Sequence, residues 1–256
     1  ALNCLARGLG LADMMYALCK GQAWYMVGPT VKLILDGNLN ERVYARDILH
    51  HIANVYGAFP GKNLEWDGDA VAAMPMQGRF TLATLSAELS AEFSLFRHDD
   101  ILRKYLNGRA SKGYEPVDPD PDAAYDEVIR IDISKIEPLV VLPHKVAHNA
   151  TEANLLAETR IDQAFIGSCA NGRIEDFEVA AEIMSGRQVA PGVRMIVTPG
   201  SQKVLQEALA KGYVETLMSA GAVVTNSTCG ACYGGHMGVL GDGEVCITAS
   251  TRNFQG

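Results

Sequence analysis

Apolar positions in the first half of the chain follow two different spacings. The mostly apolar run Val31–Leu35, closed by Asp36-Gly37, is typical of a buried strand. From residue 45 to residue 56, apolar side chains recur every three or four positions, which predicts a helix. The same spacing predicts a second helix from residue 82 to residue 96. Its core face would be formed by Leu82, Leu85, Leu89, Phe93 and Phe96.

The second half of the chain, from Ile161 onward, alternates regularly. Strands are predicted at residues 164–167, 193–197 and 222–225, and helices at residues 174–184, 202–210 and 214–218. Ser201 is a good N-cap, and Gly186 and Gly212 stand where helices end. This alternation predicts an α/β fold with a mostly parallel sheet covered by helices. In such folds ligands bind beyond the carboxyl ends of the strands.

Composition is that of an ordinary globular protein, with 48% hydrophobic and 20% charged residues among 256. The formal charge of −8 arises without any basic run, which disfavours a nucleic acid or an anionic membrane as partner. An anionic substrate would therefore need local cationic groups. No apolar run reaches the roughly 18 residues of a membrane span, and no signal-peptide pattern opens the chain. We therefore expect a cytoplasmic protein.

Six unevenly spaced cysteines fit a metal site in a reducing compartment better than a disulfide framework. Cys169 follows the predicted strand at 164–167 and precedes a helix, whose terminal amides should favour the thiolate. Cys229 and Cys232 follow the predicted strand at 222–225, so both motifs should reach the same rim of one sheet. A cubane iron–sulfur cluster held by only three thiolates keeps one iron open for a substrate oxygen, which makes it a Lewis acid.

Spacing alone leaves other interpretations of these cysteines open. Together with His236 they could form a tetrahedral Cys₃His zinc site. They could also be unliganded core thiols in a glycine-rich turn. The remaining cysteines, Cys4, Cys19 and Cys246, lie in apolar runs and are predicted to be buried core thiols.

The residues around the cysteines resemble the aconitase and 3-isopropylmalate dehydratase family. The matching motifs are Ile166–Arg173, Thr228–Gly238 and Ser250–Gly256, and the likeness runs through nearly the whole chain. This resemblance implies that Cys169, Cys229 and Cys232 bind a [4Fe–4S] cluster. It also implies that Arg252 pairs with a substrate carboxylate. Glu88, by spacing alone a solvated helical carboxylate, matches a family glutamate near the iron-bound water.

The resemblance further implies a reversible hydro-lyase that dehydrates and rehydrates a 2-hydroxy di- or tricarboxylic acid. The motifs fit best the 3-isopropylmalate dehydratase branch of leucine biosynthesis, in which the swivelling domain is a separate small subunit. The chain is therefore expected to be part of a large, cluster-bearing subunit. Alternatives are homoaconitase or another 2-hydroxy diacid dehydratase, and a non-catalytic cluster-bearing binding or sensor protein. The family's Asp-Ser-His-Thr segment is not among these residues, so a partial chain is expected that needs this segment and the small subunit for activity.

The same resemblance divides the chain into three parts. Residues 1–28 are expected to be a remnant of the family's first domain, residues 29–128 a second α/β domain, and residues 129–256 a third α/β domain that carries the cluster cysteines. Four residues differ from those usual in the family: Thr84, Ala170, Ala231 and Thr251. These changes should alter contacts around the cluster while its three ligands remain.

Overall fold

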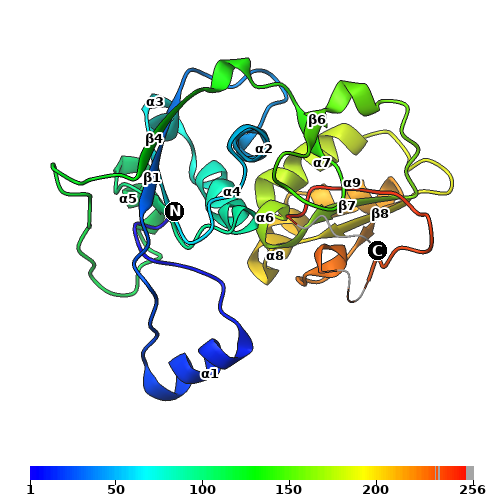
Figure 1. Cartoon of the computed structure of the whole chain (residues 1–256). Coiled ribbons are helices and arrows are strands. Elements are labelled where there is room, and N and C mark those ends of the chain that lie inside the picture. Colours follow the sequence, from blue (N-terminus) through cyan, green and yellow to red (C-terminus); the bar gives the residue numbers. More distant parts are fainter. Residues whose placement is uncertain (234, 236, 252–256) are drawn as a thin grey trace. The chain divides into compact units, whose positions relative to one another are not determined.

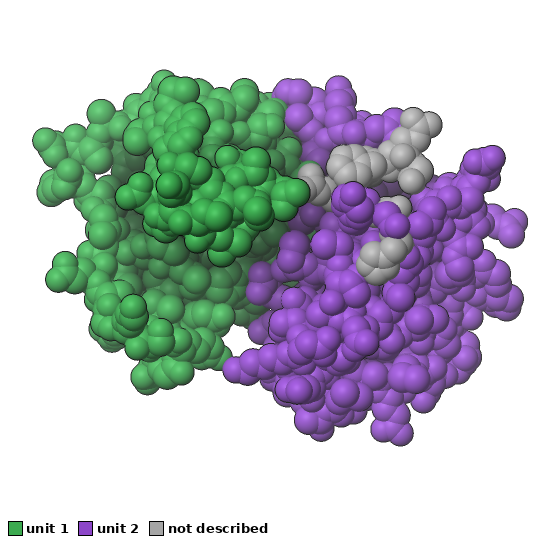
Figure 2. All heavy atoms as spheres, turned by 90° about the horizontal axis from the view of Figure 1, so that it is seen from below, with its two compact units in different colours: residues 1–137 green, residues 138–256 purple. Residues whose placement is uncertain are grey.

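The structure is a computed structural model that describes residues 1–233, 235 and 237–251. It divides into two compact units, unit 1 (Ala1–Glu137) and unit 2 (Pro138–Gly256), which are coloured separately in Figure 2. Each unit contains a parallel sheet connected by helices. The predicted α/β class is therefore confirmed.

The sheet of unit 1 has the strand order β3-β2-β1-β4, and each of these pairings is parallel. Figure 1 shows β1 and β4 side by side. Its strands are β1 (Thr30–Asp36), β2 (Asn63–Asp67), β3 (Ser94–Phe96) and β4 (Glu127–Asp132). The helical elements are α1 (Leu11–Lys20), α2 (Ala45–Tyr56), α3 (Asp69–Ala73), α4 (Met76–Leu85), η1 (Ser86–Leu89), α5 (Asp100–Leu106) and η2 (Ile133–Lys135). Val31, Leu33 and Leu35 of β1 are fully buried, because alternate side chains of a strand share one face. β1 and α2 confirm the predicted strand and helix.

The helix predicted from residue 82 to residue 96 is wrong. α4 ends at Leu85, η1 follows, and the chain then turns through Ser90, whose φ of 60° is left-handed. Residues 94–96 form β3, which pairs with β2. The apolar side chains that suggested the helix are nevertheless all buried. The spacing identified core residues, but pairing with β2 decided their secondary structure.

The main sheet of unit 2 has the strand order β10-β7-β8-β9 and is parallel throughout. Its strands are β7 (Gln163–Gly167), β8 (Arg194–Thr198), β9 (Val223–Val224) and β10 (Cys246–Thr248). The helical elements are η3 (Ala153–Leu156), α6 (Ser168–Asn171), α7 (Ile174–Met184), α8 (Gln202–Ala210), α9 (Tyr213–Ser219) and η4 (Gly230–Cys232), and β5 (Leu139–Val141) and β6 (Ala150–Glu152) form an antiparallel pair. The predicted strands and helices of this half are confirmed, while β10 was not predicted.

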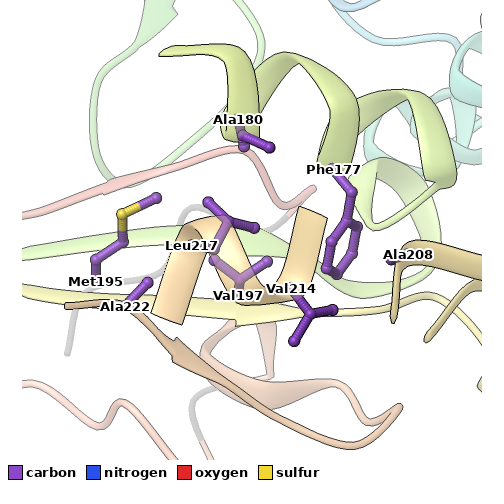
Figure 3. Close-up of a cluster of buried hydrophobic side chains, with 9 residues drawn as sticks. Phe177, Ala180, Met195, Val197, Ala208, Val214, Leu217 and Ala222 are labelled. Carbon is purple, nitrogen blue, oxygen red and sulfur yellow. The ribbon is translucent and has the colours of Figure 1, made fainter. Parts of the chain in front are cut away.

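A hydrophobic core joins the helices of unit 2 to β8. Figure 3 shows Phe177 of α7 and Val214 and Leu217 of α9 gathered around Val197 of β8. Phe177, Val197 and Leu217 have no exposed surface. Burying such side chains stabilises a fold by about 1.5–3 kcal/mol each. This core therefore fixes the position of the strand beside β7, whose end carries Cys169.

The three cysteines expected to be core thiols are not. Cys4 and Cys19 are exposed, and Cys246 is half-buried. Cys19 lies in α1, in which no residue is buried. The apolar spacing of this segment therefore does not reflect packing against the described part of unit 1.

None of the helices in the described residues combines the length and the apolar character needed to cross a membrane. The domain boundary predicted between residues 128 and 129 falls inside β4, which pairs with β1 in unit 1. The division into parts 1–28, 29–128 and 129–256 stays a prediction.

Candidate metal centre

Cys169 lies where β7 ends and the chain enters the four-residue helix α6. The preceding Ser168 is 1% exposed and has a φ of 65°, which is uncommon for a residue other than glycine. Cys169 itself is exposed. The sharp turn at Ser168 thus presents the thiol at the carboxyl edge of β7, as predicted for a site in an α/β fold.

Two glycines hold this turn against the end of β8. A Cβ atom on Gly167, whose φ is 140°, would lie 2.1 Å from the carbonyl oxygen of Thr198. A Cβ atom on Gly172 would lie 2.4 Å from the same oxygen. In addition, Gly200 N donates a hydrogen bond to Gly172 O at 2.6 Å. Only glycine permits such close approach, so main-chain contacts determine where Cys169 lies.

Cys229 directly precedes η4, the short helix that follows β9, and Cys232 ends it. Cys229 is exposed, whereas Cys232 is buried in a small cluster with Phe165 of β7 and Ile196 of β8. Between the two cysteines, Gly230 has a φ of 52°, and a Cβ atom there would lie 3.0 Å from Thr198 Oγ1 and 3.1 Å from the Phe165 ring. The turn therefore packs directly on β7 and β8.

Thr198 connects the two cysteine motifs. Its main chain touches Gly167, and its side chain touches the Gly230 position and lies 2.9 Å from the Thr225 hydroxyl, which follows β9. Thr198 has no exposed surface. The motif of Cys169 and the turn of Cys229 and Cys232 thus meet at one end of the β7-β8-β9 sheet.

The three thiols also influence one another electrostatically. Loss of hydration around the Cys169 thiol raises its pKa, and the charges of Cys232 and then Cys229 raise this pKa further. The lowering expected from helix-terminal amides is therefore wrong for the protein without metal, because desolvation and like charges outweigh it. A bound metal reverses this balance, since a coordinating thiol loses its proton.

The donor set fits an iron–sulfur cluster. Three thiols provide soft ligands, which clusters require. Ser168 Oγ and Ser227 Oγ are buried and have no hydrogen-bond partner within the described residues. These hydroxyls lie next to Cys169 and two residues before Cys229, where cluster sulfides could accept their hydrogen bonds. Within the same residues, no three His, Cys, Asp or Glu side chains are grouped to hold a single metal ion.

One further polar contact involves Cys232, one of the three predicted ligands. The Thr251 hydroxyl lies 3.6 Å from Cys232 Sγ. Thr251 is the last residue described, so Arg252, the predicted partner of a substrate carboxylate, lies outside the described residues. His236, the fourth ligand of the zinc alternative, lies outside them as well. Their roles stay predictions.

Glu88 lies in η1 of unit 1 and is half-buried. It belongs to a 3-10 helix, not to the long α-helix expected from the apolar spacing. Thr84, one of the four departures predicted from the resemblance, donates its hydroxyl to Phe80 O at 2.7 Å within α4. The proposed role of Glu88 near an iron-bound water also stays a prediction.

Sequence reasoning missed Thr198 and Thr225. Both are threonines at strand ends, and that pattern alone is too common to single them out. Their importance comes from strand order, because β8 lies between β7 and β9. A signal was nevertheless present, since ligand sites in α/β sheets use the residues at the carboxyl ends of neighbouring strands.

Comparison with known proteins gives a consistent result. The sequence matches the aconitase family (aconitate hydratase) over residues 1–158 and 144–256. It is 48% identical over 256 residues to the 3-isopropylmalate dehydratase large subunit of Mycolicibacterium smegmatis, 39% identical over 261 residues to that of Wolinella succinogenes, and 40% identical over 258 residues to that of Moorella thermoacetica. These alignments use 100% of this chain and 61%, 62% and 61% of the relatives. The chain thus spans about three fifths of their length.

Among solved structures, aconitase X of Thermococcus kodakaraensis in its holo-form aligns with 88% of this chain and 49% of its own. The sequence identity is 13% and the TM-score 0.45. A likeness this distant adds nothing to the family match.

Proposed function

The chain belongs to the aconitase family, and we propose on that premise that it is the cluster-bearing part of a hydro-lyase of the 3-isopropylmalate dehydratase type. In this proposal Cys169, Cys229 and Cys232 each bind one iron of a [4Fe–4S] cluster. The observation that carries it is the meeting of both cysteine motifs on Thr198 at one end of the sheet of unit 2. When bound, a cluster with one iron free of cysteine supplies a Lewis acid for a substrate hydroxyl.

The chain's own residues hold and surround this group. The main-chain packing of Gly167 keeps Cys169 in place, and the burial of Cys232 anchors the second motif. Ser168 Oγ and Ser227 Oγ, which have no partner within the described residues, would donate hydrogen bonds to the sulfur atoms of the cluster. Such donors stabilise the negative charge on the sulfur atoms around iron.

Two further residues complete the proposed chemistry. Arg252 binds a carboxylate of the substrate, because its planar guanidinium matches two carboxylate oxygens at once. Glu88 exchanges a proton with the water that is removed and added. The substrate is a 2-hydroxy di- or tricarboxylic acid, with 2-isopropylmalate as the first candidate.

Activity is proposed to require a second polypeptide. The relatives are named large subunits, and this name suggests a small subunit that completes the active site. We propose leucine biosynthesis as the pathway and the cytoplasm as the compartment. The group that removes the substrate's carbon-bound proton would then come from the small subunit.

The test is anaerobic reconstitution of the full-length protein with iron and sulfide, followed by iron and sulfide analysis and EPR spectroscopy. We expect about four irons per chain and, after reduction with dithionite, an EPR signal characteristic of a cluster, because the unreduced [4Fe–4S]²⁺ state has no net spin. The reconstituted protein is then mixed with its small subunit and assayed with 2-isopropylmalate, homocitrate and citrate. Zinc in place of iron would reject the cluster. A cluster without turnover of any of the three acids would favour a sensor, and turnover of another acid would reject the 3-isopropylmalate assignment.

A further inference from the structure

The loop that follows the cysteine turn is fastened to the sheet by a buried amide. Gln163, the first residue of β7, has no exposed surface, and its Nε2 donates a hydrogen bond to Gly238 O at 2.9 Å. Burying a polar side chain is unfavourable unless its hydrogen bonds are made. The position of the Gly238 carbonyl is therefore coupled to the start of β7.

Gly238 in turn packs on the cysteine turn. Its φ is 82°, and a Cβ atom on it would lie 2.9 Å from Ile196 Cδ1 and 3.0 Å from the Cβ atom of Ala231. Ala231 lies between Cys229 and Cys232. If Gly238 moved toward the sheet, it would clash with Ala231 in the cysteine turn. If it moved away, the turn would lose this packing contact.

The other end of the Gln163 amide reaches the protein surface through two charged residues. Arg194, the first residue of β8, donates Nε to Gln163 Oε1 at 3.2 Å. Its two terminal nitrogens donate to Glu244, with Nη1–Oε1 at 2.8 Å and Nη2–Oε2 at 2.5 Å. Glu244 also accepts a hydrogen bond from Gly241 N at 2.8 Å. The loop is thus held at two points, Gly238 and Gly241.

Glu244 stays ionised throughout the neutral range. The Arg194 guanidinium and the Gly241 amide lower the pKa of Glu244 to about 2. A two-pronged arginine–carboxylate pair has a defined geometry as well as favourable energy. It orients Arg194, and therefore orients the Gln163 amide that Arg194 contacts.

We propose that Gln163, Arg194 and Glu244 form a strut that positions the turn carrying Cys229 and Cys232. Gln163 is the positioning residue, because it alone contacts both Gly238 and the charged pair within the described residues. The strut acts on the cluster only through the turn and touches neither substrate nor metal. This inference rests on the proposed function, since it assumes that the turn holds iron.

The test compares the rate at which a chelator removes iron from the reconstituted full-length protein with the unfolding temperature of the apoprotein. Gln163→Glu keeps an oxygen for Arg194 but replaces the Nε2 donor with an oxygen that repels Gly238 O. We expect iron to be lost about tenfold faster than from the wild-type protein, as for other residues that support metal ligands. Glu244→Gln, which keeps the size of a half-buried side chain and should fold normally, is expected to accelerate iron loss about threefold.

A matched control is Glu207→Gln, which removes one charge from the exposed Lys211–Glu207 pair on α8 of the same unit. Its iron loss should equal that of the wild-type protein. Faster loss from Glu244→Gln with an unchanged apoprotein unfolding temperature supports the strut. Wild-type loss rates in Gln163→Glu and Glu244→Gln, or faster loss that only parallels a lowered unfolding temperature, would overturn it. Failure of the wild-type protein to bind iron would instead refute the proposed function.

Discussion

Units 1 and 2 each contain a glycine at the end of a strand, in close contact with the main chain of the neighbouring strand, but the residues that follow it differ. Gly68 follows β2, has a φ of 102°, and a Cβ atom on it would lie 2.3 Å from Leu35 O of β1. Gly167 ends β7 in the same way against Thr198 of β8. Each glycine precedes a short helix, α3 or α6. In both sheets, a strand is therefore followed or ended by a glycine that lies against the main chain of the neighbouring strand.

The difference lies in the residues that come next. In unit 1 an exposed Asp69 begins α3, and an acidic residue there suits the positive end of a helix. In unit 2 a buried Ser168 with left-handed backbone comes next, and then the exposed Cys169. The close glycine contact is thus common to both sheets and belongs to the fold, whereas Ser168 and Cys169 are what make the end of β7 a candidate metal site.

The largest effect should come from the thiol itself. Cys169→Ala removes one of the three proposed cluster ligands, so we expect loss of the cluster and of all activity, because each thiolate binds a separate iron. Iron analysis and visible absorbance after reconstitution provide the measurement. Cys19→Ala, which removes an exposed thiol from unit 1, is the control and should retain full iron content. A normal cluster in Cys169→Ala would contradict the assigned ligand set.

Substitution of Gly68 and Gly167 tests whether both glycines stabilise the fold and whether only Gly167 also supports metal binding. Gly68→Ala and Gly167→Ala should each lower the free energy of unfolding by about 3 kcal/mol, because both combine a positive φ with a main-chain clash. Urea denaturation measures this loss. Only Gly167→Ala should also weaken iron binding in the fraction that remains folded. Equal iron binding by both variants would mean that Gly167 serves the fold alone.

Unit 1 also contains an ion pair whose guanidinium is buried, Arg79–Asp99. Arg79 is 1% exposed, and it donates to both carboxylate oxygens of Asp99 and to the carbonyls of Val71 and Met74. Partial burial alone would raise the pKa of Asp99, but hydrogen bonds from Arg79 and Leu102 N hold it below its usual value. This pair should stabilise the protein fully above about pH 4, and the stabilisation should disappear as the pH falls further.

Asp99→Asn should therefore lower the free energy of unfolding at pH 7 by about 2 kcal/mol, since a guanidinium is left buried without its counter-charge. Urea denaturation between pH 6 and pH 3 measures both the loss and its pH dependence, which should be weaker in the variant. Asp126→Asn, in the exposed Lys62–Asp126 pair, is the control and should change stability by less than about 0.5 kcal/mol. Identical pH profiles for Asp99→Asn and the wild-type protein would contradict this account.

The smallest effect is expected at Thr251. Thr251→Val keeps the shape of the side chain and removes the hydroxyl that lies 3.6 Å from Cys232 Sγ. Because hydrogen bonds involving sulfur are weak, we expect iron to be lost about twofold faster, with unchanged unfolding of the apoprotein. Thr159→Val, which changes an exposed threonine of unit 2, is the control. A loss rate equal to that of the wild-type protein would remove Thr251 from the cluster's surroundings.

Local signals were sufficient for much of unit 2. The helices at 174–184 and 202–210 were predicted with the bounds that the structure gives, because apolar spacing, Ser201 and the following glycines agree. The three-residue strands β3 and β10 could not be predicted, since pairing with a neighbouring strand defines them. For the same reason the helix expected at 82–96 was wrong although its apolar residues are buried.

The candidate site divides in a similar way. Both cysteine motifs were predicted to reach one edge of a sheet, and the structure brings them together there. Thr198 and Gln163 were missed because each gains its role from contacts with residues more than 25 positions away. Such contacts leave no periodic pattern in the sequence. The exposure of Cys4 and Cys19 was missed because apolar neighbours in sequence need not be neighbours in a core.

The glycine contacts of the Cys169 turn also divide the site for directed evolution. Gly167 and Gly172 contact β8 through main-chain atoms. A variant in which either glycine is replaced would therefore misplace the Cys169 thiol, whatever substrate it was selected for. Ala170, by contrast, is a buried residue of α6, and Ala231 packs against the cluster of Phe165, Ile196 and Cys232. Both belong to the four departures from the residues expected by resemblance. A search for altered activity should therefore begin with the alanines and leave the glycines unchanged.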